Sequence, residues 1–286
     1  MKAQRVAASL RRFGFTLVEL LIVIVIGGIL ATISVQFIIN AVLGVSDTAE
    51  RQQMVTVATL VAERISREVR QALPNSVRVF DKNGDGKTEC IEFIPVKQAS
   101  RYLGTLGGTV TSSLEVVSPG AISGYLSVYP LGVSGLYPNG ATQAITPETV
   151  NFGSAASCPQ SGDLQTCTQY EGGGGIAQQF PADSPQKRFF VVDSPVSFCV
   201  GKIGGADYLL RYYDYGFTTT AGSSISTSSC PTSSCQVFTD KLKALEFNYA
   251  PASLTRAAVV TFSLTLENQR NESLTMNQQV QVRNVP

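Results

Sequence analysis

The first long hydrophobic segment of the chain runs from Phe15 to Val35 (FTLVELLIVIVIGGILATISV), and Glu19 is its only charged residue. About 20 apolar residues at ~1.5 Å each match a hydrocarbon layer of ~30 Å. The pattern therefore predicts a membrane-spanning helix over residues 15–45. A carboxylate inside such a helix costs roughly 2.5–3.5 kcal/mol, which makes Glu19 a candidate functional residue that needs a partner.

From about Ser46 the pattern becomes amphipathic, and residues 46–73 are predicted to continue the same helix. Proline is absent from Phe15 to Leu73, and Pro74 with Asn75 predicts where the helix stops. The apolar stripe needs to be covered, and a sheet from downstream residues is the natural candidate. Apolar residues recur at steps of three and four, at Met54, Ala58, Val61, Ile65, Val69 and Ala72.

Downstream of Pro74 the period changes from helical to strand-like. Residues 258–267 alternate as AVVTFSLTLE, residues 268–271 form a predicted turn, and residues 273–283 follow as a second strand, which together predict a terminal hairpin. The fold class is therefore α+β: a long N-terminal helix packed on an antiparallel β-sheet domain over residues 74–286. Shorter predicted strands cover residues 76–80, 89–96, 114–117, 125–129, 189–193, 196–200, 208–213 and 244–249.

Residues 97–187 differ in composition from the rest of this domain. They contain 14 of the 25 glycines and only eight charged side chains. We expect a loop-rich insertion with a few strands.

The charges before the hydrophobic segment predict its orientation. Lys2, Arg5, Arg11 and Arg12 precede it without any acidic residue, so residues 1–14 should stay cytoplasmic and the rest should face outward. The chain has 22 basic and 21 acidic side chains, and removal of the four leader cations leaves 18 against 21, a net charge of −3. That charge gives no reason to expect nucleic-acid binding.

The segment Gly14-Phe15-Thr16-Leu17-Val18-Glu19, between a basic leader and an apolar run, resembles the type IV prepilin signature of pilins and type II secretion pseudopilins. The resemblance implies a pilin-like fold and cleavage by a membrane prepilin peptidase between Gly14 and Phe15, followed by N-methylation of Phe15. It also implies that Glu19 pairs with the Phe15 ammonium of a neighbouring subunit and so sets the axial register. An ordinary signal anchor, the alternative, explains neither the Gly-Phe junction nor the position of Glu19.

Three further segments narrow the resemblance: residues 72–78 (ALPNSVR), 91–95 (IEFIP) and 196–200 (VSFCV). They are similar to minor prepilin-like proteins of the mannose-sensitive haemagglutinin (MSHA) pilus system, of the MshO kind, to which PilW- and GspJ-like minor subunits are related. This resemblance implies a minor pilin that initiates or regulates pilus assembly. It implies as partners other pilin subunits, the inner-membrane assembly machinery and membrane lipid, and a single-pass inner-membrane location before transfer to the pilus. A pilus-tip adhesin and a type II secretion minor pseudopilin remain alternatives.

All six cysteines fall on the outward side, where disulfides persist. Cys158 with Cys167 and Cys230 with Cys235 are close in sequence, and we expect these two local pairs. Cys90 with Cys199 then remains as a long-range pair, among 15 connectivities that six cysteines allow. A zinc site is the competing use, and the absence of histidine and of CxxC spacing argues against it.

Residues 81–92 (DKNGDGKTECIE) satisfy the pattern of a calcium-binding loop. The pattern assigns side-chain oxygens to Asp81, Asn83, Asp85 and Glu92, and a carbonyl oxygen to Lys87. The flanking segments look like strands and not like the helices of an EF-hand, so a metal-free turn built from Asn-Gly-Asp-Gly is the other interpretation.

Nothing in the sequence predicts an enzyme. Without histidine there is no Ser-His or Cys-His pair, and the glycines at 172–175 lack the Lys-Ser/Thr of a phosphate-binding loop. We therefore expect no catalytic residues and no required cofactor, with calcium as the one ligand that the sequence suggests.

Overall fold

The computed structural model describes residues 16–252, 256–268 and 270–282. The chain divides into two compact units, residues 1–53 and residues 54–286. One helix, α1 (Leu17–Arg70), makes up the described part of the first unit from Leu17 onward and continues into the second unit. The α+β class expected from the sequence is confirmed, because this helix is followed by antiparallel strands.

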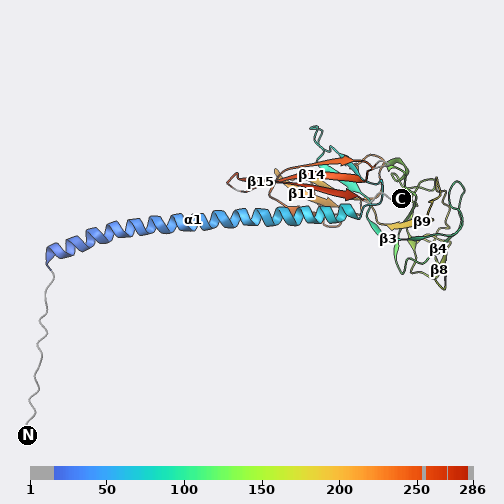
Figure 1. Cartoon of the computed structure of the whole chain (residues 1–286), viewed down its shortest axis with the longest axis horizontal. Helices are drawn as coiled ribbons and strands as arrows, with labels where there is room; N and C mark the ends of the chain where they lie inside the picture. Colours follow the sequence, from blue (N-terminus) through green and yellow to red (C-terminus); the bar gives the residue numbers. More distant parts are fainter. Residues whose placement is uncertain (1–15, 253–255, 269, 283–286) are drawn as a thin grey trace, which may run out of the picture. The chain divides into compact units, whose positions relative to one another are not determined.

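In the second unit the C-terminal end of α1 packs on two antiparallel sheets (Figure 1). This end of the helix and the two sheets together are called the first lobe. One sheet has the order β1-β2-β10-β11-β12 and the other the order β13-β14-β15. The strands of the first sheet are β1 (Arg78–Phe80), β2 (Cys90–Phe93), β10 (Val196–Ile203), β11 (Ala206–Tyr212) and β12 (Cys235–Thr239). Those of the second are β13 (Leu242–Ala250), β14 (Ala258–Glu267) and β15 (Ser273–Val282).

The amphipathic stripe of the helix forms one side of this core. Every residue predicted for the stripe is buried, and Ile65 and Val69 are completely inaccessible. The strands supply the other side with alternate residues, such as Phe198 of β10 and Phe247 of β13. Burial of one such side chain is worth about 1.5–3 kcal/mol, so tertiary contacts hold this half of the helix in place.

The helix ends at Arg70, three residues before the expected end at residue 73. The last turn tightens, because the amides of Gln71 and Ala72 bond to carbonyls three residues back. The next residues pair with the chain that follows β2: the amide of Leu73 donates to the carbonyl of Ile94 at 2.8 Å, and the amide of Val96 donates to the carbonyl of Gln71 at 2.9 Å. Residues 71–73 contain no proline and were expected to be helical. They pair with the chain after β2 instead of forming the last turn of the helix.

Residues 96–192 form a second lobe, which Figure 1 shows beyond the C-terminal end of α1. The chain enters and leaves this lobe at one place, because the amide of Asp193 donates to the carbonyl of Pro95 at 3.0 Å. One sheet of the lobe consists of β3 (Val96–Arg101), β9 (Arg188–Val192), β5 (Ser123–Val128) and β6 (Val150–Asn151), in that order. The other consists of β4 (Leu114–Val117), β8 (Leu164–Cys167) and β7 (Gln160–Ser161), and a short 3-10 helix covers Val133–Gly135.

The second lobe has more structure than the glycine-rich composition of residues 97–187 suggested. It contains a core of its own, in which Phe152, Phe180 and Phe189 are almost completely buried. A further apolar cluster joins the two lobes, with Leu73 and Ile94 from the first lobe against Phe190 and other residues of the second. Five of the 14 glycines in residues 97–187 have positive φ, where a side chain would be strained, at Gly104, Gly108, Gly120, Gly162 and Gly173.

Candidate functional site

The start of α1 is fixed by a side-chain cap. The hydroxyl oxygen of Thr16 accepts a hydrogen bond from the amide of Glu19 at 3.2 Å, and the carbonyl of Thr16 accepts the first helical bond from Leu20. This is the N-cap of a helix, with Glu19 in its first turn, where the helix dipole favours a negative charge. Sequence reasoning had missed the cap, although the spacing Thr-x-x-Glu before an apolar run signals it.

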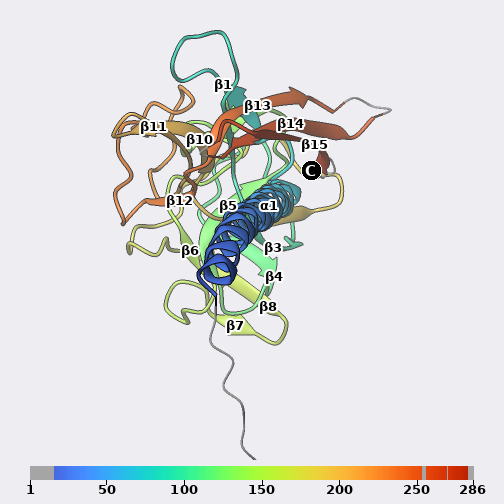
Figure 2. The ribbon, with the colours of Figure 1, turned by 90° about the vertical axis from the view of Figure 1, so that its left-hand side faces the viewer.

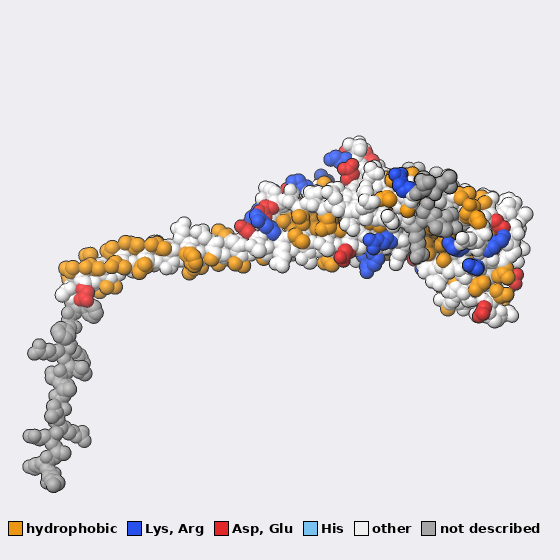
Figure 3. All heavy atoms as spheres, viewed as in Figure 1, with side chains coloured by type: hydrophobic (Ala, Val, Ile, Leu, Met, Phe, Trp, Pro, Cys, Tyr) orange, Lys and Arg blue, Asp and Glu red, His pale blue; other side chains and the backbone are white. Residues whose placement is uncertain are grey.

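The first unit exposes almost all of its apolar side chains. From Leu17 to Val45 the large hydrophobic residues are 49–80% exposed, and Figure 3 shows many apolar side chains along the visible surface of this part of α1. Within the described residues, α1 is the one helix long and apolar enough to cross a membrane, and none of its most apolar stretch is buried. Exposure of so many side chains to water would cost on the order of 30 kcal/mol or more, so this surface requires lipid or other helices.

Gly14 and Phe15, the residues of the expected cleavage junction, lie outside the described residues. Glu19 lies on the exposed surface of the apolar helix. Among the described residues no lysine or arginine forms an ion pair with it.

The predicted calcium loop connects β1 to β2, so strands flank it as the sequence indicated. Figure 2 shows this loop projecting above β1, away from the body of the lobe. Asp81 is held by the loop backbone: its Oδ1 accepts the amide of Gly84 at 2.6 Å and its Oδ2 accepts the amide of Gly86 at 2.7 Å. These bonds, that of Gly86 above all, hold the pKa of Asp81 below its ordinary value.

Glu92 is not part of the loop, which corrects the ligand set expected from the sequence. It lies in β2 directly opposite Arg78 of β1, is completely buried, and accepts two hydrogen bonds of 3.0 Å from the Arg78 guanidinium. Its place is taken by Glu89, whose carboxylate lies with those of Asp81 and Asp85, all within 4.8 Å of one another. Glu89 is the ninth residue of the loop, a position that often contributes a calcium ligand, and this was the signal that could have identified it.

The three disulfides are the pairs expected from the sequence: Cys90–Cys199, Cys158–Cys167 and Cys230–Cys235. Cys90 and Cys199 face each other on the paired strands β2 and β10, with their Cα atoms 4.2 Å apart. The chain between them includes the whole second lobe, so this bridge closes the base of the insertion.

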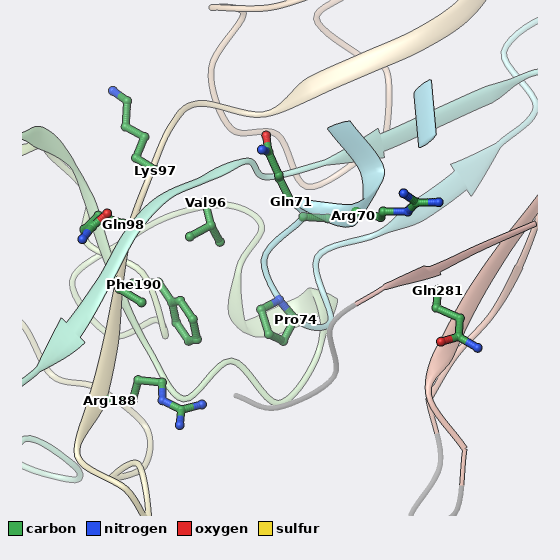
Figure 4. Close-up of a pocket in the computed structure, with 11 residues that line it drawn as sticks. Arg70, Gln71, Pro74, Val96, Lys97, Gln98, Arg188, Phe190 and Gln281 are labelled. Atoms are coloured by element: carbon green, nitrogen blue, oxygen red, sulfur yellow. The ribbon is translucent and has the colours of Figure 1, made fainter. Parts of the chain in front are cut away.

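A hollow of about 980 Å³ in the second unit lies where the chain leaves α1 and passes into β3 (Figure 4). Arg70, Lys97 and Arg188 bring positive charge to it, with Pro74 and Phe190 as apolar walls. The described residues that line it include no acid, thiol or hydroxyl group.

A polar cluster organises the end of the second lobe around Asp183. The Asp183 carboxylate accepts hydrogen bonds from the Tyr102 hydroxyl at 2.8 Å, the Leu106 amide at 3.0 Å and the Lys187 ammonium at 2.5 Å. Burial raises the pKa of Asp183, but the bonds from Lys187, Leu106 and Tyr102 outweigh that effect and bring it to about 2.

Comparison with known proteins finds one match. A family model described as the prokaryotic N-terminal methylation motif matches residues 10–35. No curated protein and no solved structure matches the chain. The N-terminus is therefore of the type IV pilin kind, which implies processing by a prepilin peptidase and assembly with other pilins, and is consistent with membrane anchoring.

Proposed function

We propose that this chain is a minor subunit of a type IV pilus that initiates or regulates filament assembly, after cleavage between Gly14 and Phe15 and methylation of Phe15. One observation carries the proposal: the described part of the matched motif, residues 16–35, lies on a capped helix whose apolar surface is exposed along residues 17–45. That surface suits lipid before assembly and neighbouring helices afterwards. In this proposal the chain is a structural subunit and not an enzyme, and it requires no cofactor.

Glu19 sets the register between subunits in this mechanism. A carboxylate in an apolar bundle is strongly disfavoured unless a cation and hydrogen-bond donors face it. The Phe15 ammonium of a neighbouring subunit supplies both, since cleavage creates it four residues before Glu19. A helix out of register would leave both charges unpaired, so the pair selects the correct axial stagger.

An MSHA-type pilus is the more specific form of the proposal, and three short segments favour it. In the structure residues 72–78, 91–95 and 196–200 lie together: Ala72 bridges to Pro95, and β2 pairs with β10. The resemblance therefore concerns one connected region, the junction between the helix and the first sheet.

Replacement of Glu19 by Gln tests the register mechanism. Glu63, an exposed acidic residue of the same helix, provides the matched control Glu63→Gln. Glu19→Gln should be cleaved normally, while its recovery in sheared pili should fall by roughly tenfold to a hundredfold, because one charge-assisted hydrogen bond is worth about 1.5–3 kcal/mol. Glu63→Gln should assemble like the wild type. Equal recovery of the two variants in pili would refute the register role, and an intact N-terminus in cells with active peptidase would refute the proposal as a whole.

A pilus-tip adhesin is the second candidate, and the second lobe favours it because it has its own core and leaves the first lobe at a single point. A variant in which a short Gly-Ser linker joins Pro95 to Asp193 separates the two functions. Normal piliation with lost attachment would favour adhesion, and lost piliation would favour assembly, provided that formation of the Cys90–Cys199 bridge shows a folded first lobe. Normal piliation with impaired enzyme secretion would instead indicate a secretion pseudopilin.

A further inference from the structure

The loop between β1 and β2 gathers three carboxylates at one point. Oxygen atoms of Asp81, Asp85 and Glu89 lie within 4.8 Å of one another. Among the described residues none of the three forms an ion pair, and the ammonium of Lys82 donates to the carbonyl of Gly222 at 2.7 Å. Three negative charges at this spacing repel one another, and a cation among them would remove that repulsion.

Glu89 supplies an independent observation that points to a ligand. Its side chain is only 5% exposed, and its two oxygens differ sharply. The Oε1 atom accepts hydrogen bonds from the amides of Lys82 at 3.0 Å and Asn83 at 3.1 Å. The Oε2 atom is buried and has no hydrogen-bond partner. A buried carboxylate oxygen without a partner is costly, by about 1–3 kcal/mol or more, unless something else satisfies it.

The loop holds these groups in place from both sides. Glu89 immediately precedes β2, where the disulfide at Cys90 and the bond from the Val200 amide to the Glu89 carbonyl fix the backbone. Asp81 is held from the other side by the amides of Gly84 and Gly86. Both glycines have positive φ, +80° and +85°, so the turn that directs these amides inward would be strained with other residues.

We propose that this loop binds a calcium ion through the carboxylates of Asp81, Asp85 and Glu89. The donors are all oxygen, and the loop contains no histidine, methionine or thiol that would favour a transition metal. Calcium accepts six to eight oxygens in flexible geometry, so the Asn83 side chain, backbone carbonyls and water can complete its coordination. The proposal is independent of the assembly function, because it concerns a loop of the second unit and not the apolar helix.

The full-length protein in detergent, with its disulfides intact, tests the proposal by titration with calcium chloride after treatment with a chelator. Extracellular calcium modules bind with Kd values of about 10⁻⁴–10⁻³ M. At a hundred times the Kd, calcium should raise the Tm by about 5–10 °C for a folded unit of this size. Calorimetry should give one calcium ion per chain, and magnesium should have a much smaller effect.

Glu89→Gln and Asp85→Asn are the test variants, with Glu115→Gln on the exposed face of β4 as the control of equal charge change. Glu89→Gln keeps an oxygen for the amides of Lys82 and Asn83, so the calcium-free variant should melt no lower than the wild type. Both test variants should lose the calcium-induced Tm rise, while Glu115→Gln should keep it. The absence of a Tm rise in the wild type at 10 mM calcium, or an equal rise in all four proteins, would overturn the proposal.

Discussion

Breaking the buried ion pair between Arg78 and Glu92 should destabilise the second unit strongly. The side chain of Glu92 is fully buried and that of Arg78 is 11% exposed, and two 3.0 Å hydrogen bonds join them. Arg78 also donates to the carbonyls of Thr218 and Thr219 at 2.8 and 2.9 Å, and its guanidinium lies 3.8 Å from the ring centre of Tyr137. Arg78 therefore connects the paired strands β1 and β2 to the loop at Thr218 and Thr219 and to Tyr137 of the second lobe.

The substitution Glu92→Gln keeps the size of the side chain and removes its charge. The guanidinium of Arg78 would then remain buried without a counter-ion, a loss that costs about 3–5 kcal/mol. For a folded unit of about 230 residues, 1 kcal/mol corresponds to about 2–4 °C, so the Tm should fall by about 6–20 °C.

The matched control is Glu267→Gln. Glu267 also pairs with a cation, at 2.5 Å from the Lys243 ammonium, but the two side chains are 30% and 48% exposed. Water can solvate Lys243 when its partner is lost, so this substitution should cost less than about 1 kcal/mol. Thermal unfolding of both variants, followed by circular dichroism under non-oxidising and non-reducing conditions, gives the comparison. If Glu92→Gln melted within about 2 °C of Glu267→Gln, the reasoning that burial makes the Arg78 pair essential would be wrong.

Two further outcomes are expected for the second unit. Replacement of Cys90 and Cys199 by Ala should lower the free energy of unfolding by about 4–5 kcal/mol, because their bridge closes a loop of about 110 residues. Replacement of Cys230 and Cys235, which are only five residues apart, should lower it by about 2 kcal/mol. Equal losses of Tm in the two variants would contradict the loop-length argument. The pKa of Asp183 is about 2 in the folded protein against an ordinary 3.8, so its contribution to stability is present above about pH 4 and disappears as the pH falls toward 2. The Tm difference between Asp183→Asn and the wild type should therefore be largest near pH 5 and shrink toward pH 2, and a difference that stays constant would refute the ionic origin.

Local patterns predicted much of the fold because each depends on residues near one another in the sequence. The 3.6-residue period after Ser46 predicted the buried face of the helix, and the alternation in residues 258–267 predicted β14 and its pairing with β15. The cysteine pairs followed from short spacings and from elimination. The calcium loop was visible as a pattern, and Glu19 stood out as the one charge in an apolar run.

Other features were decided only where distant segments meet. Pro74 predicted a helix end nearby, and the pairing of Gln71 and Leu73 with the chain after β2 decided that the helix ends at Arg70. Strands β6, β7, β8 and β12 were not predicted, because their own sequences carry little strand pattern. Each of them is hydrogen-bonded to a neighbouring strand in its sheet.

The sequence by itself determined that an apolar helix with one acid would precede the β-rich part of the chain, and that an oxygen-rich turn would follow this helix, because hydrophobic period and residue type are local properties. Only the tertiary structure decided which carboxylates gather in that turn. The register of β1 against β2 places Glu92 opposite Arg78 in the interior and leaves Glu89 beside Asp81 and Asp85. Strand register depends on the packing of the whole sheet, and no twelve-residue pattern contains that information.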